Sequence, residues 1–140
     1  MKLEKEHNLP AELPKTISNS SKIIYLSACL GIINPILINL FTPINSFSDP
    51  TDLVIILVST GILIFLGYDI SLGKNWARIV FTVLCGLGFL LLQFIILETF
   101  RMTPVVGFLS LLQAFLQGLA IFFLFKSDSR EWYKKVKQTK

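Results

Sequence analysis

The chain has 140 residues, of which 53% are hydrophobic and 16% are charged, with a formal net charge of +4 and a mean hydropathy of +0.67. Soluble domains carry about 25% charged residues, and the apolar residues here fall in long blocks without alternation, so the composition excludes both a soluble globular fold and a disordered chain. The length allows about one domain.

The first 21 residues are polar and include Pro10 and Pro14. They lack the short apolar region and the small-residue cleavage site of a secretory signal peptide. We therefore expect residues 1–21 to form a mobile cytoplasmic arm rather than a cleaved leader.

Four long apolar stretches follow, at about 23–41, 53–72, 76–97 and 104–125. A bilayer core about 30 Å thick requires roughly 20 apolar residues of helix, and each stretch comes close to that length. The runs are continuous rather than alternating, which favours helices over barrel strands. The spacers are short, so neighbouring spans should be antiparallel. The sequence thus predicts an all-α fold in which residues 22–125 form an integral membrane four-helix up-down bundle.

Signals for helix ends agree with these stretches. Asp49-Pro50 and Thr103-Pro104 each place a capping side chain before a proline, a pattern typical of the first residues of a helix. Gly73 suits the end of the second helix, and Asn75 is predicted to cap the third.

Lysine and arginine are divided unequally between the two sides of such a bundle. Twelve of the 13 lie in residues 1–22, the loop 73–78 and the tail 126–140, all on one side, and Arg101 alone lies on the other. Because short basic segments stay in the cytoplasm, both termini are predicted to be cytoplasmic. Aromatic residues suited to the membrane interface gather on the same side: Tyr25, Tyr68, Trp76, Trp132 and Tyr133.

The tail, residues 126–140, is basic and amphipathic. Trp132, Tyr133 and Val136 share one side of a helix that would start near Asp128, so a short helix lying on the membrane surface is predicted, with a frayed tail as the alternative. Together with Trp76 and Arg78, the residues Trp132 and Tyr133 are predicted to anchor the chain at the lipid interface.

Each span carries a stripe of small and polar residues. Helices associate in lipid through such residues, so we expect these stripes to line the bundle interior. In the third span the stripe is Thr82, Gly86 and Gln93. Pro35 should kink the first span because it lacks an amide hydrogen. The candidates for helix packing or for a cavity are Asn34, Pro35, Gln93, Ser110, Gln113, Ala114, Gln117 and Gly118.

The amide side chains within the spans allow two interpretations. They could line a polar cavity for a small solute, or they could form hydrogen bonds between helices. We favour hydrogen bonding because transport generally requires an ionisable residue inside the membrane, and the nearest one identified is Glu98, at the outer end of the third span.

Chemistry-bearing residues are sparse. Cys29 and Cys85 are expected to pack as small apolar residues rather than to form a redox pair. His7 is the only histidine, so no multi-histidine metal site and no haem site can be built. Nucleotide-binding and hydrolase motifs are absent from the sequence. We therefore expect no catalytic residue, no cofactor, no metal and no enzymatic activity, and the basic ends need not imply nucleic acid.

The most individual stretch is Gly73-Lys74-Asn75-Trp76-Ala77-Arg78, which joins a helix-ending glycine to an interfacial Trp and an Arg. It resembles the G-K/R-N-W-A-R hairpin of small uncharacterised bacterial four-helix inner-membrane proteins, and the end of the fourth span, from Leu124 to Trp132, is similar to theirs. This resemblance implies a multi-pass protein of the bacterial inner membrane and no particular activity.

Two functions are compatible with these features. The first is a non-enzymatic inner-membrane protein that binds another membrane component or itself, such as an immunity or accessory protein. The second is a small oligomeric channel or transporter for a small solute. The lipid bilayer is the one partner that the sequence requires, with a membrane-protein partner or a homo-oligomer as candidates.

Overall fold

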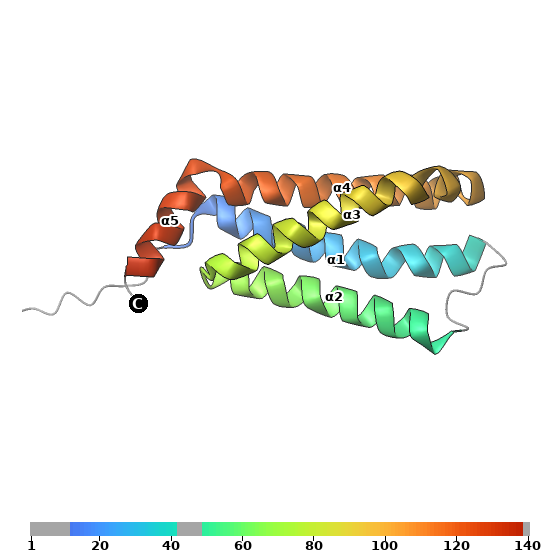
Figure 1. Cartoon of the computed structure of the whole chain (residues 1–140), viewed down its shortest axis with the longest axis horizontal. Coiled ribbons are helices and arrows are strands. Elements are labelled where there is room, and N and C mark those ends of the chain that lie inside the picture. The colour runs from blue at the N-terminus through green and yellow to red at the C-terminus, as the bar shows by residue number, and fades with distance from the viewer. Residues whose placement is uncertain (1–11, 42–48, 139–140) are drawn as a thin grey trace, which may run out of the picture.

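The computed structural model describes residues 12–41 and 49–138, and the regular structure in these residues is entirely helical. The helices are α1 (Lys15–Phe41), α2 (Pro50–Ser71), α3 (Asn75–Met102), α4 (Pro104–Phe125) and α5 (Ser127–Gln138). The first four are long and apolar enough to cross a membrane. They run up and down along one another, while α5 turns across one end of the bundle (Figure 1). The predicted all-α four-helix fold is confirmed.

Helix α1 begins at Lys15, within the segment 1–21 that was predicted to be a mobile arm. The Pro14 carbonyl accepts hydrogen bonds from the amides of Ile17 and Ser18, so this proline starts the helix. The side chains of Ile17 and Ser20 are fully buried. The first turns of α1 are therefore part of the folded protein, and the rest of the predicted arm, residues 1–11, lies outside the described residues.

Of the three predicted capping side chains, that of Asp49 caps its helix and the other two do not. Asp49 Oδ1 accepts a hydrogen bond of 2.9 Å from the Thr51 amide, which also holds the pKa of Asp49 below its ordinary value. Thr103 is the N-cap of α4 but makes no side-chain capping bond. Asn75, which was predicted to cap α3, is instead its first helical residue. Gly73, with a φ of 76°, reverses the chain directly after α2, so that the extended residue Lys74 takes the N-cap position one residue earlier than predicted.

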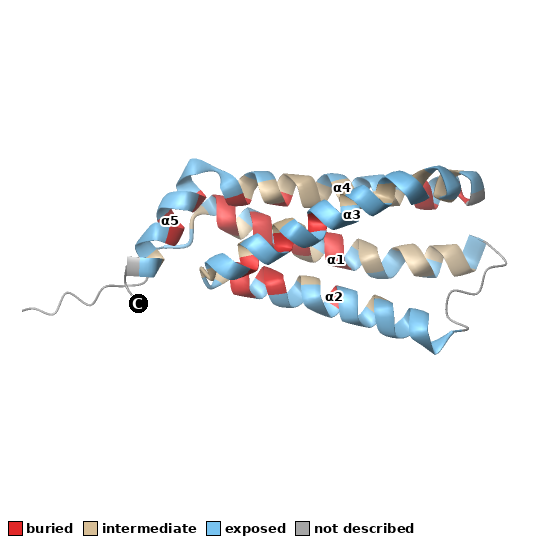
Figure 2. Cartoon of the chain, in the orientation of Figure 1, coloured by how far each residue is buried: buried red, intermediate tan, exposed pale blue. Residues whose placement is uncertain are grey.

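The buried residues gather in the half of the bundle nearest α5, whereas most of the opposite half is exposed (Figure 2). Helix α1 packs against both α2 and α4, and α3 packs mainly against α4. The main cluster joins residues from all five helices: Ile17, Ile24, Leu66, Ile70, Ala77, Phe81, Cys85, Ala120, Leu124, Trp132 and Tyr133. We call the half of the bundle nearest α5, which contains this cluster, the base. The opposite half is packed more loosely.

Small residues allow close contact between α1 and α2 within the base. The Ser21 hydroxyl donates to the Gly67 carbonyl at 3.4 Å. A Cβ added at Gly67 would lie 2.9 Å from Tyr25 Cε1, closer than any real side chain tolerates. Gly67 is therefore required where these helices touch, as expected for helices that associate in lipid.

Helix α5 presents its apolar face to the bundle, not to lipid. Trp132 and Tyr133 are only 8% and 5% exposed, and the Tyr133 hydroxyl donates to the Ile70 carbonyl at 3.1 Å. The Ser129 hydroxyl is hydrogen-bonded to the Phe123 carbonyl and to the Thr16 hydroxyl, at 2.8 and 2.9 Å. The helix forms as predicted, but these two aromatic residues are buried in protein and do not serve as the predicted lipid anchors.

Candidate functional site

Two of the predicted polar candidates meet between α1 and α4. Asn34 Nδ2 donates a hydrogen bond of 3.3 Å to Gln113 Oε1. Gln113 also lies over Gly31, where an added Cβ would be 3.4 Å from its Nε2. Pro35 follows Asn34 within an unbroken α1. This arrangement supports the interpretation of these amides as interhelical hydrogen-bonding groups.

The other candidates on α4 are half-buried and make fewer specific contacts. The Ser110 hydroxyl donates to the Val106 carbonyl of its own helix at 2.9 Å. Ala114 and Gln117 are neither fully buried nor fully exposed. A Cβ at Gly118 would lie 3.9 Å from Phe89 Cζ, which is ordinary van der Waals contact. Gly118 is therefore not a point of close helix approach.

The predicted interior stripe on α3 is not its inner face. Gly86 and Gln93 are both exposed, and a Cβ added at Gly86 would meet nothing within 4 Å. The buried residues of this helix near the base are Ala77, Phe81 and Cys85. Helix α3 runs obliquely across the bundle (Figure 1), and near the base the large side chain of Phe81, not the predicted stripe, packs against the neighbouring helices.

The sequence analysis missed a buried acidic residue. Asp69 lies within the predicted span 53–72, in the last turn of α2, and is 1% exposed. Its Oδ1 is 2.9 Å from Lys74 Nζ, and this is the one ion pair among residues 12–41 and 49–138. The signal was present in the sequence, because an Asp and a Lys flanking a tight glycine turn are close enough to pair.

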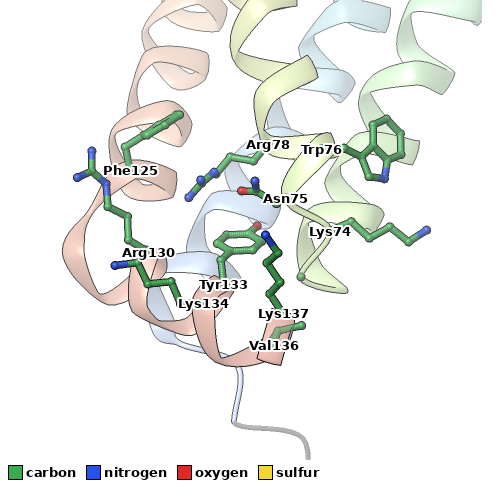
Figure 3. A pocket seen from close by; sticks show the side chains of 11 residues that line it. Lys74, Asn75, Trp76, Arg78, Phe125, Arg130, Tyr133, Lys134, Val136 and Lys137 are labelled. Carbon is green, nitrogen blue, oxygen red and sulfur yellow. The ribbon is translucent and has the colours of Figure 1, made fainter. Parts of the chain in front are cut away.

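An open cavity of about 750 Å³, which we call the basic cleft, lies between the start of α3 and α5 (Figure 3). Five of the residues that line it are cationic, and none is acidic. The Lys74 and Trp76 side chains point away from α5. The lining residues are Gly73, Lys74, Asn75, Trp76, Arg78, Phe125, Arg130, Tyr133, Lys134, Val136 and Lys137.

Two of the predicted interface anchors lie at this cleft. Trp76 is 47% exposed, and its ring packs against Phe65 of α2 with 6.2 Å between centroids, a position compatible with contact to lipid. The Arg78 guanidinium lies 4.9 Å from the ring centroid of Phe125 and 4.8 Å from that of Tyr133. Arg78 is thus held against protein by two cation–π contacts.

The described residues offer no cluster of three or more His, Cys, Asp or Glu that could hold a metal ion. Cys29 is exposed and Cys85 is buried, and both are free thiols. Cys85 packs in the main cluster as a small apolar residue, as expected, whereas Cys29 is exposed and does not pack within the bundle.

Comparisons with protein-family models, with curated proteins and with solved structures found no match to this chain.

Proposed function

We propose that the protein is a non-enzymatic component of the bacterial inner membrane that acts by binding another membrane-spanning helix, from a partner protein or from a second copy of itself. The observation that carries this proposal is the position of Gln93. Its amide is exposed on α3, about 7 Å from the helix midpoint at 1.5 Å per residue. At this depth the side chain faces hydrocarbon unless another protein covers it.

An amide in hydrocarbon is costly. Moving an unpaired amide from water into an apolar medium costs about 2–7 kcal/mol, depending on the reference state. Gln93 forms no hydrogen bond with any residue of the described chain. A polar group on a partner helix would satisfy it, and such bonds are a recognised means of association in membranes.

A neighbouring glycine gives the partner room to approach. Gly86 precedes Gln93 by seven residues, which is about 20° short of two full helical turns, so both lie on one face of α3. The space beside Gly86 is open. A small residue followed by a polar residue on the same exposed face is what two helices need to pack closely in lipid.

The test uses Gly86→Ile and Gln93→Leu in lipid vesicles. Both variants should reduce self-association measured by energy transfer between labelled copies, or capture of a partner from native membranes. Gly88→Ile is the matched control, because Gly88 is equally open but lies about 160° away on the same helix. Association that is unchanged in both test variants, or lost equally in Gly88→Ile, would reject this face as the interface.

A channel or transporter is the second candidate. It is favoured by the half-buried Gln113 and Gln117 on α4 and by Asn34 Oδ1, which is buried and has no partner in the described chain. Solute flux across sealed vesicles that is lost in Gln117→Leu would support this function, and tight vesicles would support the binding protein.

A further inference from the structure

The basic cleft gathers cations from two separate elements. Arg78 comes from the first turn of α3, and Arg130, Lys134 and Lys137 come from α5. None of the four forms an ion pair with another residue of the described chain. Arg78 and Arg130 line the same cleft. Like charges brought together by the fold are stabilised when an anion lies between them.

Arg78 is oriented before any ligand arrives. The rings of Phe125 and Tyr133 hold its guanidinium at 4.9 and 4.8 Å, and one terminal nitrogen lies 3.5 Å from the Leu124 carbonyl oxygen. Its Nε is buried and has no hydrogen-bond partner among the described residues. A guanidinium offers several donors in a rigid planar fork that matches the oxygens of a phosphate group.

The first turn of α3 adds backbone donors at the same place. Gly73 has a φ of 76°, which turns the chain so that α3 starts at Asn75, and no side chain caps this helix. The first amides of a helix have no partner within it, and Asn75 and Trp76 line the cleft. Phosphate groups bind readily at such helix starts.

In a membrane crossed by the four helices, the cleft would lie at the level of the lipid headgroups. It is at the end of four helices that are long enough to cross the membrane, and Figure 3 shows Arg78 between Phe125 and Tyr133 at this end. Anionic phospholipids carry their phosphodiester at this level. Free phosphate has the same chemistry and can reach the cleft from water.

We propose that the basic cleft is a binding site for a phosphate group, supplied by the headgroup of an anionic phospholipid or by phosphate in solution. Arg78 is the central ligand, the first turn of α3 contributes amides, and the cations of α5 complete the charge. This site is separate from the α3 face of the proposed function, and neither depends on the other.

The experiment measures binding to the full chain in nanodiscs of phosphatidylcholine. Phosphatidylglycerol is added as a minor component, and the amount retained after extraction into neutral detergent is counted by native mass spectrometry. Inorganic phosphate is then added as a competitor. Retained phosphatidylglycerol that phosphate does not displace identifies the headgroup as the source, and displacement by phosphate identifies the free ion as a ligand. Both results support the site.

Substitution of exposed residues in the cleft tests the site without disturbing the fold. Arg130→Gln and Lys137→Gln should each weaken phosphatidylglycerol or phosphate binding on the order of tenfold, because each removes a charged hydrogen-bond donor. Arg78→Lys should weaken binding similarly, since it keeps the charge but loses the planar fork. Lys126→Gln is the matched control, because Lys126 is exposed at the same end but does not line the cleft.

Two outcomes would overturn the proposal. The first is that neither phosphatidylglycerol nor phosphate binds the wild-type protein above the phosphatidylcholine background. The second is that Lys126→Gln weakens binding as much as the cleft variants do. The second outcome would mean that the general positive charge of this end attracts anions without a defined site.

Discussion

Asp69 and Lys74 connect the end of α2 to the residue before α3. The carboxylate is almost completely buried, whereas the lysine side chain remains 39% exposed. A negative charge in the last turn of a helix is opposed by the helix dipole, so Asp69 depends on Lys74 for compensation. The lysine depends less on Asp69, because water can solvate it.

This asymmetry predicts unequal effects of the two single substitutions. Lys74→Met should lower the free energy of unfolding on the order of 3 kcal/mol, because it leaves a buried charge unpaired. Asp69→Asn should cost about 1 kcal/mol, because it removes a hydrogen bond but leaves no buried charge. Titration with a denaturing detergent measures both.

The double variant Asp69→Asn/Lys74→Met is the control for this comparison. It should be more stable than Lys74→Met alone, because the second change removes the charge that the first one strands. A double variant that loses the sum of both single effects would show that the two residues act independently.

Local chemistry made one of the residue-level predictions reliable, although Asn75 and Thr103 do not form the predicted capping bonds. The Asp49 cap depends on three consecutive residues, and the sequence predicts it correctly. Gln93 was assigned to the bundle interior from its spacing alone, and it is exposed. Periodicity can show which residues share a face, but it cannot show which face turns inward when Leu, Ile and Phe occur on every side of the helix.

At the scale of single elements, α5 differs most from its predicted position. A basic helix with an apolar face is typical both of a membrane-surface helix and of a helix that packs on protein. The hydrogen bond from Tyr133 to Ile70 and the hydroxyl contacts of Ser129 favour packing on protein. These partners are far apart in the sequence, so no local pattern could reveal them.

The burial of Tyr133 gives the α5 contact a predicted pH dependence. Burial raises the pKa of Tyr133 to about 12 from an ordinary 10.0, and the nearby charge of Arg78 offsets part of this rise. The unfolded chain therefore releases this proton at a lower pH than the folded chain. The stability that the contact contributes is complete below about pH 10 and is lost as the pH rises towards about 12.

An alkaline absorbance titration checks this pH dependence by following ionised tyrosine. One of the three tyrosines should ionise late, together with a loss of α5 packing seen in the fluorescence of Trp132. Tyr133→Phe should remove the late ionisation, whereas Tyr68→Phe should leave it, because Tyr68 is 56% exposed. A late ionisation that persists in Tyr133→Phe would contradict the assignment.

At the scale of the whole molecule, hydropathy was sufficient to predict four spans and their antiparallel order. The lengths of the apolar stretches are set by the thickness of the bilayer, so they are visible without any knowledge of packing. The concentration of buried residues in the base was not predictable. The base is closed by contacts between residues more than a hundred positions apart, such as Thr16 with Ser129.

The unequal distribution of lysine and arginine predicts that the α5 end faces the cytoplasm. In a chain with Cys29→Ala, a membrane-impermeant thiol reagent should label Lys126→Cys only from the cytoplasmic side and Asp52→Cys only from the outside. Both positions are exposed, so the lack of labelling from one side reports orientation and not burial. Labelling of Lys126→Cys from the outside would reverse the predicted topology.

The main cluster joins Ile17 near the start of α1 to Tyr133 in α5, and this has a consequence for biogenesis. Four spans that have inserted into a membrane still cannot complete the base until α5 packs across their end. A translation product that stops after Phe125 would remain in the bilayer with Ile70 and Leu124 uncovered. Such a product would leave the apolar side chains at this end of the bundle exposed to water, so α5 completes the fold of the four spans.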